Sequence, residues 1–171
     1  DSAIEAASGL GLARMLLVSR LNLAAMLMNM RRFGEARDVI GLVEQDTAVV
    51  HMGPGLGAAL LTLRGMSELF EEDGERDRHT RLRAAESLFR QAMETDPAAD
   101  ATSLVENSYY LACCLVEQGR VEEAGLVLDN ADRALSDALS SIRSNIYRDS
   151  ILETPPVRRF VEMRRRIGGC P

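Results

Sequence analysis

Apolar and polar residues alternate with a helical period along most of the chain, and two stretches do so in the same register. The stretches "NLAAMLMNMRRFGEARDVI" (22–40) and "LACCLVEQGRVEEAGLVL" (111–128) place apolar residues three and four apart on both sides of a short polar turn. The spacing predicts two hairpins of antiparallel amphipathic helices, one spanning 13–48 and the other 104–136.

A third hairpin is predicted at 56–97, with Gly65 in its first helix and Phe89 in its second. Between these helices lies "EEDGERDRHT" (71–80), whose charge and glycine predict a solvated insertion in the turn. The glycine-rich stretch "HMGPGLG" (51–57) predicts a linker between the first two hairpins.

Beyond the third hairpin, residues 137–171 predict a helical extension and a cap. The apolar stripe continues toward about residue 152, which predicts a long amphipathic helix or two helices with a kink, through Leu135, Leu139, Ile142 and Ile146. The stretch "ETPPVRRFVEMRRRIGG" has a Thr-Pro start and a Gly-Gly stop, so it predicts a capping helix. Residues 1–10 are predicted to be the end of an earlier element, and the start at Asp1 suggests a fragment of a longer protein.

Small residues recur at matching positions of the hairpins and would let paired helices approach closely: Ala24, Ala36, Ala85, Ala112 and Ala124. Over about two thirds of the chain this arrangement resembles the tetratricopeptide repeat family, with three irregular repeats. The alanines at 36, 85 and 124 are 49 and 39 residues apart, against a period of about 34 in that family. The resemblance implies one all-α domain over 1–171, a right-handed superhelical array of antiparallel hairpins that ends in a long C-terminal helix and a capping helix.

Composition leaves little material for catalysis. All twenty basic residues are arginine, which excludes phosphate-loop, Schiff-base and kinase-type lysines. His51 and His79 have no partner at metal-ligand or triad spacing, and the adjacent Cys113 and Cys114 lie in an apolar helical pattern. We therefore predict no enzyme, no metal and no cofactor, in a reducing intracellular and cytoplasmic setting. The longest apolar run is interrupted by polar residues, and we expect it to be too short for a membrane span.

The first helices of the hairpins carry the main functional prediction, because residues 15–30 are apolar on almost every side. In the family that the chain resembles, first helices line a concave groove. The matching positions here are Val18, Leu21, Ala25, Met28, Asn29, Thr62, Met66, Leu69, Glu106, Tyr109, Cys113 and Val116. The resemblance implies a scaffold, adaptor or chaperone-like module that binds a helical or extended apolar segment of another protein. The chain's own C-terminal helix, a neighbouring repeat or self-association could fill the groove instead.

A basic tail contrasts with the net charge of −6. Arg158, Arg159, Arg165 and Arg166 could bind nucleic acid, an anionic surface or an acidic protein, or could dock on the acidic body of the chain itself. The acidic balance of the whole chain and the lack of an aromatic platform in the tail argue against nucleic acid.

Overall fold

The fold is all-helical, as predicted, throughout the part of the chain that the structure describes. The structure is a computed structural model that describes residues 2–46, 53–71 and 77–168, with side chains from residue 11 onward. Within these ranges there are eight helices and no strand. The helices are α1 (Ser2–Asn29), α2 (Phe33–Glu44), α3 (Pro54–Phe70), α4 (Arg78–Thr95), α5 (Ala101–Glu117), α6 (Val121–Ser141), α7 (Asn145–Leu152) and α8 (Pro155–Ile167).

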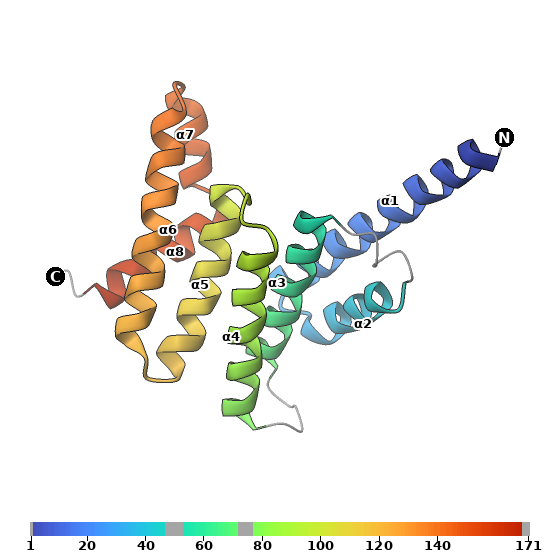
Figure 1. Cartoon of the computed structure of the whole chain (residues 1–171). Helices are drawn as coiled ribbons and strands as arrows, with labels where there is room; N and C mark the ends of the chain where they lie inside the picture. The colour runs from blue at the N-terminus through green and yellow to red at the C-terminus, as the bar shows by residue number, and fades with distance from the viewer. Residues whose placement is uncertain (1, 47–52, 72–76, 169–171) are drawn as a thin grey trace.

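Successive helices pack in pairs, and the pairs follow one another across the molecule (Figure 1). Helix α1 packs on α2, α3 on α4, and α5 on α6. Between pairs, α3 contacts both α1 and α2, α5 contacts α3 and α4, and α8 contacts α5 and α6. One continuous apolar core therefore runs through all three hairpins and ends under α8 at Val157 and Phe160.

The turns of the first and third hairpins share one backbone conformation. Arg31 and Gly119 occupy the same position and both have a positive φ, of 60° and 77°. In each turn the next amide donates to the carbonyl oxygen five residues earlier: Arg32 to Leu27 at 2.9 Å and Arg120 to Leu115 at 2.8 Å. A left-handed residue followed by this long-range bond is a common way to end a helix.

The middle hairpin is held by a close approach of helix backbone to an aromatic ring. A Cβ atom at Gly65 would lie 2.7 Å from the ring of Phe89. Phe89 is fully buried, and it stacks on Tyr110 of α5 with ring centroids 5.6 Å apart. The lack of a side chain at Gly65 therefore makes room for the buried ring of Phe89.

The linker and the charged insertion are shorter than predicted. Residues 54–57 form the first turn of α3, with Pro54 at a favoured position for the start of a helix. Residues 78–80 belong to α4, and Asp77 caps this helix by accepting a hydrogen bond from the Thr80 amide at 3.0 Å. Gly53 and Glu71 lie next to these helices without belonging to them, and residues 51–52 and 72–76 lie outside the described residues.

Both ends of the chain differ from the sequence prediction. Helix α1 extends without a break to Ser2, so residues 2–10 do not form a separate element. The stripe predicted to run through Ile146 ends earlier, because Ile142 takes an extended conformation and ends α6. Ile146 is 80% exposed, and no residue of α7 is buried. Two helices are present, as the second alternative predicted, but a non-helical segment at 142–144 separates them where a kink was expected.

Candidate partner-binding site

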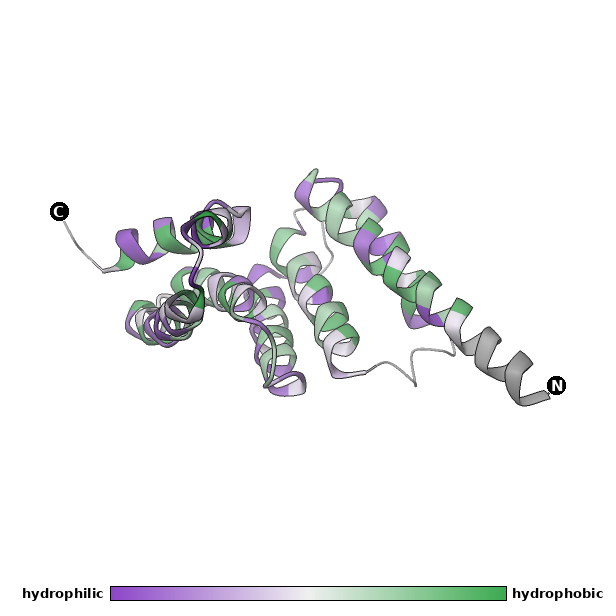
Figure 2. Ribbon diagram, turned by 90° about the horizontal axis from the view of Figure 1, so that it is seen from above, coloured by the Kyte–Doolittle hydropathy of each residue, from purple (hydrophilic) through white to green (hydrophobic). Residues whose placement is uncertain are grey.

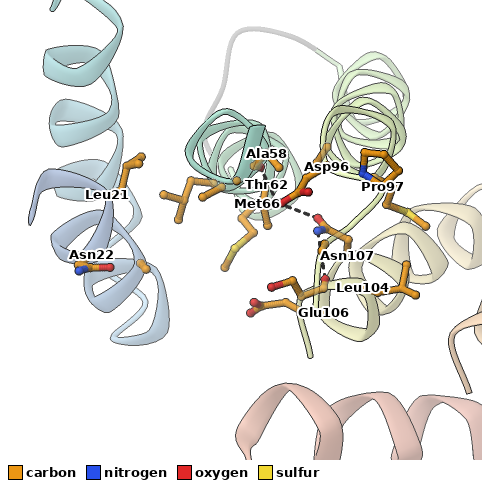
Figure 3. A pocket seen from close by; sticks show the side chains of 18 of the residues that line it. Leu21, Asn22, Ala58, Thr62, Met66, Asp96, Pro97, Leu104, Glu106 and Asn107 are labelled. Atoms are coloured by element: carbon orange, nitrogen blue, oxygen red, sulfur yellow. Dashed lines mark hydrogen bonds between the residues drawn. The ribbon is translucent and has the colours of Figure 1, made fainter. Parts of the chain in front are cut away.

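A small hollow lies among α1, α3, α5 and the end of α4 (Figure 3). Its volume is about 250 Å³. Its lining is mostly apolar and the polar atoms belong to a few side chains, a composition typical of ligand sites. The lining residues are Leu21, Asn22, Ala25, Asn29, Gly55, Ala58, Ala59, Thr62, Leu63, Met66, Ala92, Met93, Asp96, Pro97, Ala99, Ser103, Leu104, Glu106 and Asn107.

Six of the predicted groove residues meet at this hollow: Leu21, Ala25, Asn29, Thr62, Met66 and Glu106. Met28 lines a neighbouring hollow of about 270 Å³ with Tyr110 and Arg159. Leu69 is buried in the core, and Val18 is half-buried away from both hollows. Tyr109, Cys113 and Val116 are partly buried against the core at the α5 end.

The predicted residues are more deeply buried than an open groove requires. Among them only Asn29 is exposed, whereas Leu21, Met28 and Met66 are less than 8% exposed. All three belong to the core of the fold, and Leu21 and Met66 form the floor of the hollow. The half-buried residues Ala25 and Ala59 face the hollow from α1 and α3, so they are the positions where a substitution can change the hollow without emptying the core.

A buried polar pair fixes the relative position of α3 and α5 at this floor. The Thr62 hydroxyl donates to the Asn107 side-chain carbonyl at 2.8 Å. The Asn107 amide nitrogen donates in turn to the Ser103 carbonyl oxygen at 3.1 Å. These side chains set a polar stripe in an apolar hollow, and their hydrogen bonds within the fold offset the cost of removing them from water. The sequence prediction missed Asn107, although a polar residue on a buried helix face is a signal of this kind of pair.

Helix α8 closes the α5 end of the predicted groove. The Arg159 guanidinium donates to the Tyr110 hydroxyl at 3.1 Å and lies 5.7 Å from the ring centroids of both Tyr109 and Tyr110. It also lies 3.9 Å from the Glu106 carboxylate. The chain therefore covers part of its own groove, as one of the alternatives predicted, although the short α8 does so and not a long helix. The hollow between α1 and α3 stays open (Figure 3).

Burial governs the protonation of the groups around Arg159. It raises the pKa of Glu106, with Arg159 opposing that shift, and it raises the pKa of Tyr109 to about 12. Burial also raises the pKa of the Cys113 thiol to about 11 and that of Cys114 to about 12. Both thiols are therefore protonated and weakly nucleophilic at neutral pH. Among the described residues, no three His, Cys, Asp or Glu side chains are grouped to hold a metal ion.

Three of the four predicted tail arginines, Arg158, Arg159 and Arg165, line one open hollow along α8 together with Glu162. Arg159 turns inward to Tyr110, while Arg158, Arg165 and Arg166 are exposed. Arg164, which the sequence analysis did not select, pairs with Asp129 at 3.3 Å and with Asp132 at 3.1 Å on α6. Part of the basic tail thus docks on the acidic body of the chain.

One helix is long and apolar enough to cross a membrane by length and composition, contrary to the expectation from the interrupted apolar run. This segment is Gly11–Asn29 of α1, and only 28% of its most apolar window is buried. Helices in the cores of soluble proteins and N-terminal signal sequences meet the same criterion, so it is weak evidence for a span. What it does show is an apolar helix at the edge of the molecule with much of its surface uncovered (Figure 2).

Comparison with known proteins identifies no relative. No family model, no curated protein and no solved structure matches the chain.

Proposed function

We propose that the protein is a non-enzymatic interaction module that binds a helical or extended segment of another protein at the hollow between α1, α3 and α5. The observation that carries the proposal is the hollow itself, with its apolar lining and the Thr62–Asn107 pair across its floor. A tetratricopeptide-like array of three hairpins in a right-handed superhelix is the architecture that we propose for it. The shared turns at Arg31 and Gly119 and the packing of each hairpin on the next support that architecture.

The size of the hollow limits what it accepts. Its volume of about 250 Å³ is below the range of about 300–1,000 Å³ that holds a drug-sized ligand. It therefore fits one or two anchoring side chains of a partner, whose remaining residues would lie along the rim. Asn22 and Asn29 are exposed at that rim and can hydrogen-bond to a partner's backbone.

The test uses short peptides selected for binding from a displayed random library, with their affinities measured by fluorescence anisotropy. Ala25→Glu and Ala59→Glu place a charge in the hollow from half-buried positions. We avoid Met28 and Met66, because a charge at these buried positions would test stability and not binding. Ala138→Glu on α6, which is half-buried outside the hollow, is the matched control.

We expect the two hollow variants to weaken binding by at least about tenfold, since a desolvated charge without a partner costs more than 1.4 kcal/mol. The control should bind as the unmodified chain does, and raising the salt concentration should change little. Equal binding by all variants would exclude the hollow. If binding instead weakened steeply as the salt concentration rose, and was also lost in the triple variant Arg158→Ala, Arg165→Ala, Arg166→Ala, an anionic ligand on the tail would be favoured.

A further inference from the structure

The outer face of α1 carries an uncovered apolar stripe. Its members are spaced four, seven, three and four residues apart and are 46–69% exposed: Leu12, Leu16, Leu23, Met26 and Met30. We call these five residues the α1 stripe. It lies opposite the face that packs into the core through Leu21 and Ala24. With Ser19 included, the stripe alternates spacings of four and three, the pattern by which one helix packs along another.

The corresponding face is covered in the third hairpin. In α5 the positions of Leu23 and Met26 hold Leu111 and Cys114, which are at most 1% exposed. The position of Met30 holds Gln118, whose amide donates to Glu86 of the preceding helix α4 at 3.1 Å. This face of a first helix is thus the one on which a helix packs elsewhere in the molecule.

The α1 stripe differs in charge from the matching face of α3, and this difference limits which kind of helix can pack on it. In α3 the positions of Leu23 and Met30 hold Arg64 and Glu71, which form ion pairs with Glu44 and Arg37 of α2. The α1 stripe has apolar side chains at both positions. A helix that presents acidic and basic side chains there would lose their hydration without gaining a partner. The occupant must therefore be apolar at the same spacing.

We propose that the α1 stripe binds the α1 stripe of a second copy of this chain, with the two helices antiparallel about a two-fold axis. Antiparallel pairing places Leu12 opposite Met30 and Leu16 opposite Met26 of the other copy, so four of the five apolar residues meet another apolar residue. Ser19 lies opposite Leu23, and its hydroxyl already donates to the Met15 carbonyl at 2.9 Å. Burial of the stripe thus strands no polar group at its centre.

Charge along α1 is compatible with this pairing. Between Leu12 and Met30 the only charged residues are Arg14 and Arg20. Arg20 flanks the stripe near the two-fold axis, and it pairs with Asp46 at 2.9 Å within its own copy. The Arg20 charge of each copy is therefore neutralised within that copy. This surface lies on the opposite side of α1 from its core-packing face, and the proposal does not depend on the function proposed for the hollow.

The test is sedimentation velocity of the full chain over a range of concentrations, for the unmodified protein and for Met26→Glu. Leu126→Glu is the matched control, because Leu126 on α6 is 66% exposed and Met26 is 61% exposed. We expect a reversible dimer whose dissociation constant rises more than about a hundredfold in Met26→Glu, because two-fold symmetry buries the new charge twice. The control should remain dimeric, and far-UV circular dichroism should show that both variants stay helical.

Disulfide cross-linking tests the orientation, in a background with the native cysteines replaced by alanine. A mixture of Ser19→Cys and Leu23→Cys chains should cross-link to each other, whereas either variant alone should not. Cross-linking of each variant to itself would overturn the antiparallel arrangement. A chain that stays monomeric at all concentrations, or a dimer that persists in Met26→Glu, would overturn the proposal. Flotation with phosphatidylcholine vesicles tests a membrane as the occupant. If the unmodified chain were monomeric and floated with the vesicles while Met26→Glu did not, the stripe would bind a membrane and the proposal would be overturned.

Discussion

Replacing Gly65 by alanine tests the close packing of the middle hairpin. The added Cβ would lie 2.7, 2.8 and 3.0 Å from three carbon atoms of the Phe89 ring, closer than unstrained carbon contacts allow. The ring cannot move away easily, because Phe89 is fully buried and stacks on Tyr110 at 5.6 Å. Overpacking of this kind costs about 1–3 kcal/mol, while alanine favours a helix interior over glycine by about 1 kcal/mol. We expect a net loss of up to about 2 kcal/mol.

Urea unfolding followed by far-UV circular dichroism measures the loss. Gly41→Ala in α2 is the control, since a Cβ there meets nothing within 4 Å. Gly41→Ala should raise the free energy of unfolding by about 0.5–1 kcal/mol, so the two substitutions should have opposite signs. If Gly65→Ala stabilised the chain as much as Gly41→Ala does, the close contact between α3 and α4 would be wrong.

A compensating substitution sharpens this test. In the third hairpin the positions of Gly65 and Phe89 hold Ala112 and Leu128, and both are buried with at most 1% exposed. Phe89→Leu should therefore make room for alanine at position 65. In that background, Gly65→Ala is expected to be neutral or stabilising, with a coupling of at least about 1 kcal/mol in the double-mutant cycle. Additive effects would show that the strain arises elsewhere.

Two further predictions concern the turns and the groove. Only glycine adopts a positive φ without strain, and Arg31 and Gly119 both have one. Arg31→Gly should therefore raise the free energy of unfolding by about 0.5–1 kcal/mol, and Gly119→Ala should lower it by about 1 kcal/mol. Thermal and urea unfolding measure both changes. Burial raises the pKa of Glu106 in the folded state, so its contribution to stability is present at low pH and is lost as the pH rises from 4.5 through the raised value. Glu106→Gln should remove that decline in urea unfolding over a pH series, and an unchanged decline would contradict the assignment.

The all-helical class was predictable from sequence because helical periodicity is a local property of the chain. The alignment of the first hairpin with the third was also predictable to the residue, since the aligned residues Arg31 and Gly119 take the same left-handed conformation. The exact starts of α3 and α4 were missed. There, local capping by Pro54 and Asp77 outweighs the glycine and charge content that suggested loops.

The candidate site was less predictable, because it depends on which helix covers which face. Met28 and Met66 were expected to line an open groove, but both are buried. When a helix is apolar on every side, its sequence does not indicate which side faces the core. Arg159 is one of several arginines in the tail, and only the path of α8 brings it to Tyr110. The pairing of Thr62 with Asn107 likewise joins residues 45 positions apart.

Helix α7 has a consequence for how freely the chain can vary. It links α6 to α8 without a fully buried residue, and within it only Ile151 packs against the core. The rest of its sequence is constrained mainly by the need to span the gap between α6 and α8. For a flexible replacement, each doubling in length would cost only about 0.6 kcal/mol in closure entropy. Insertions, tags or whole domains could therefore be accommodated at this point while α8 keeps its place on the core.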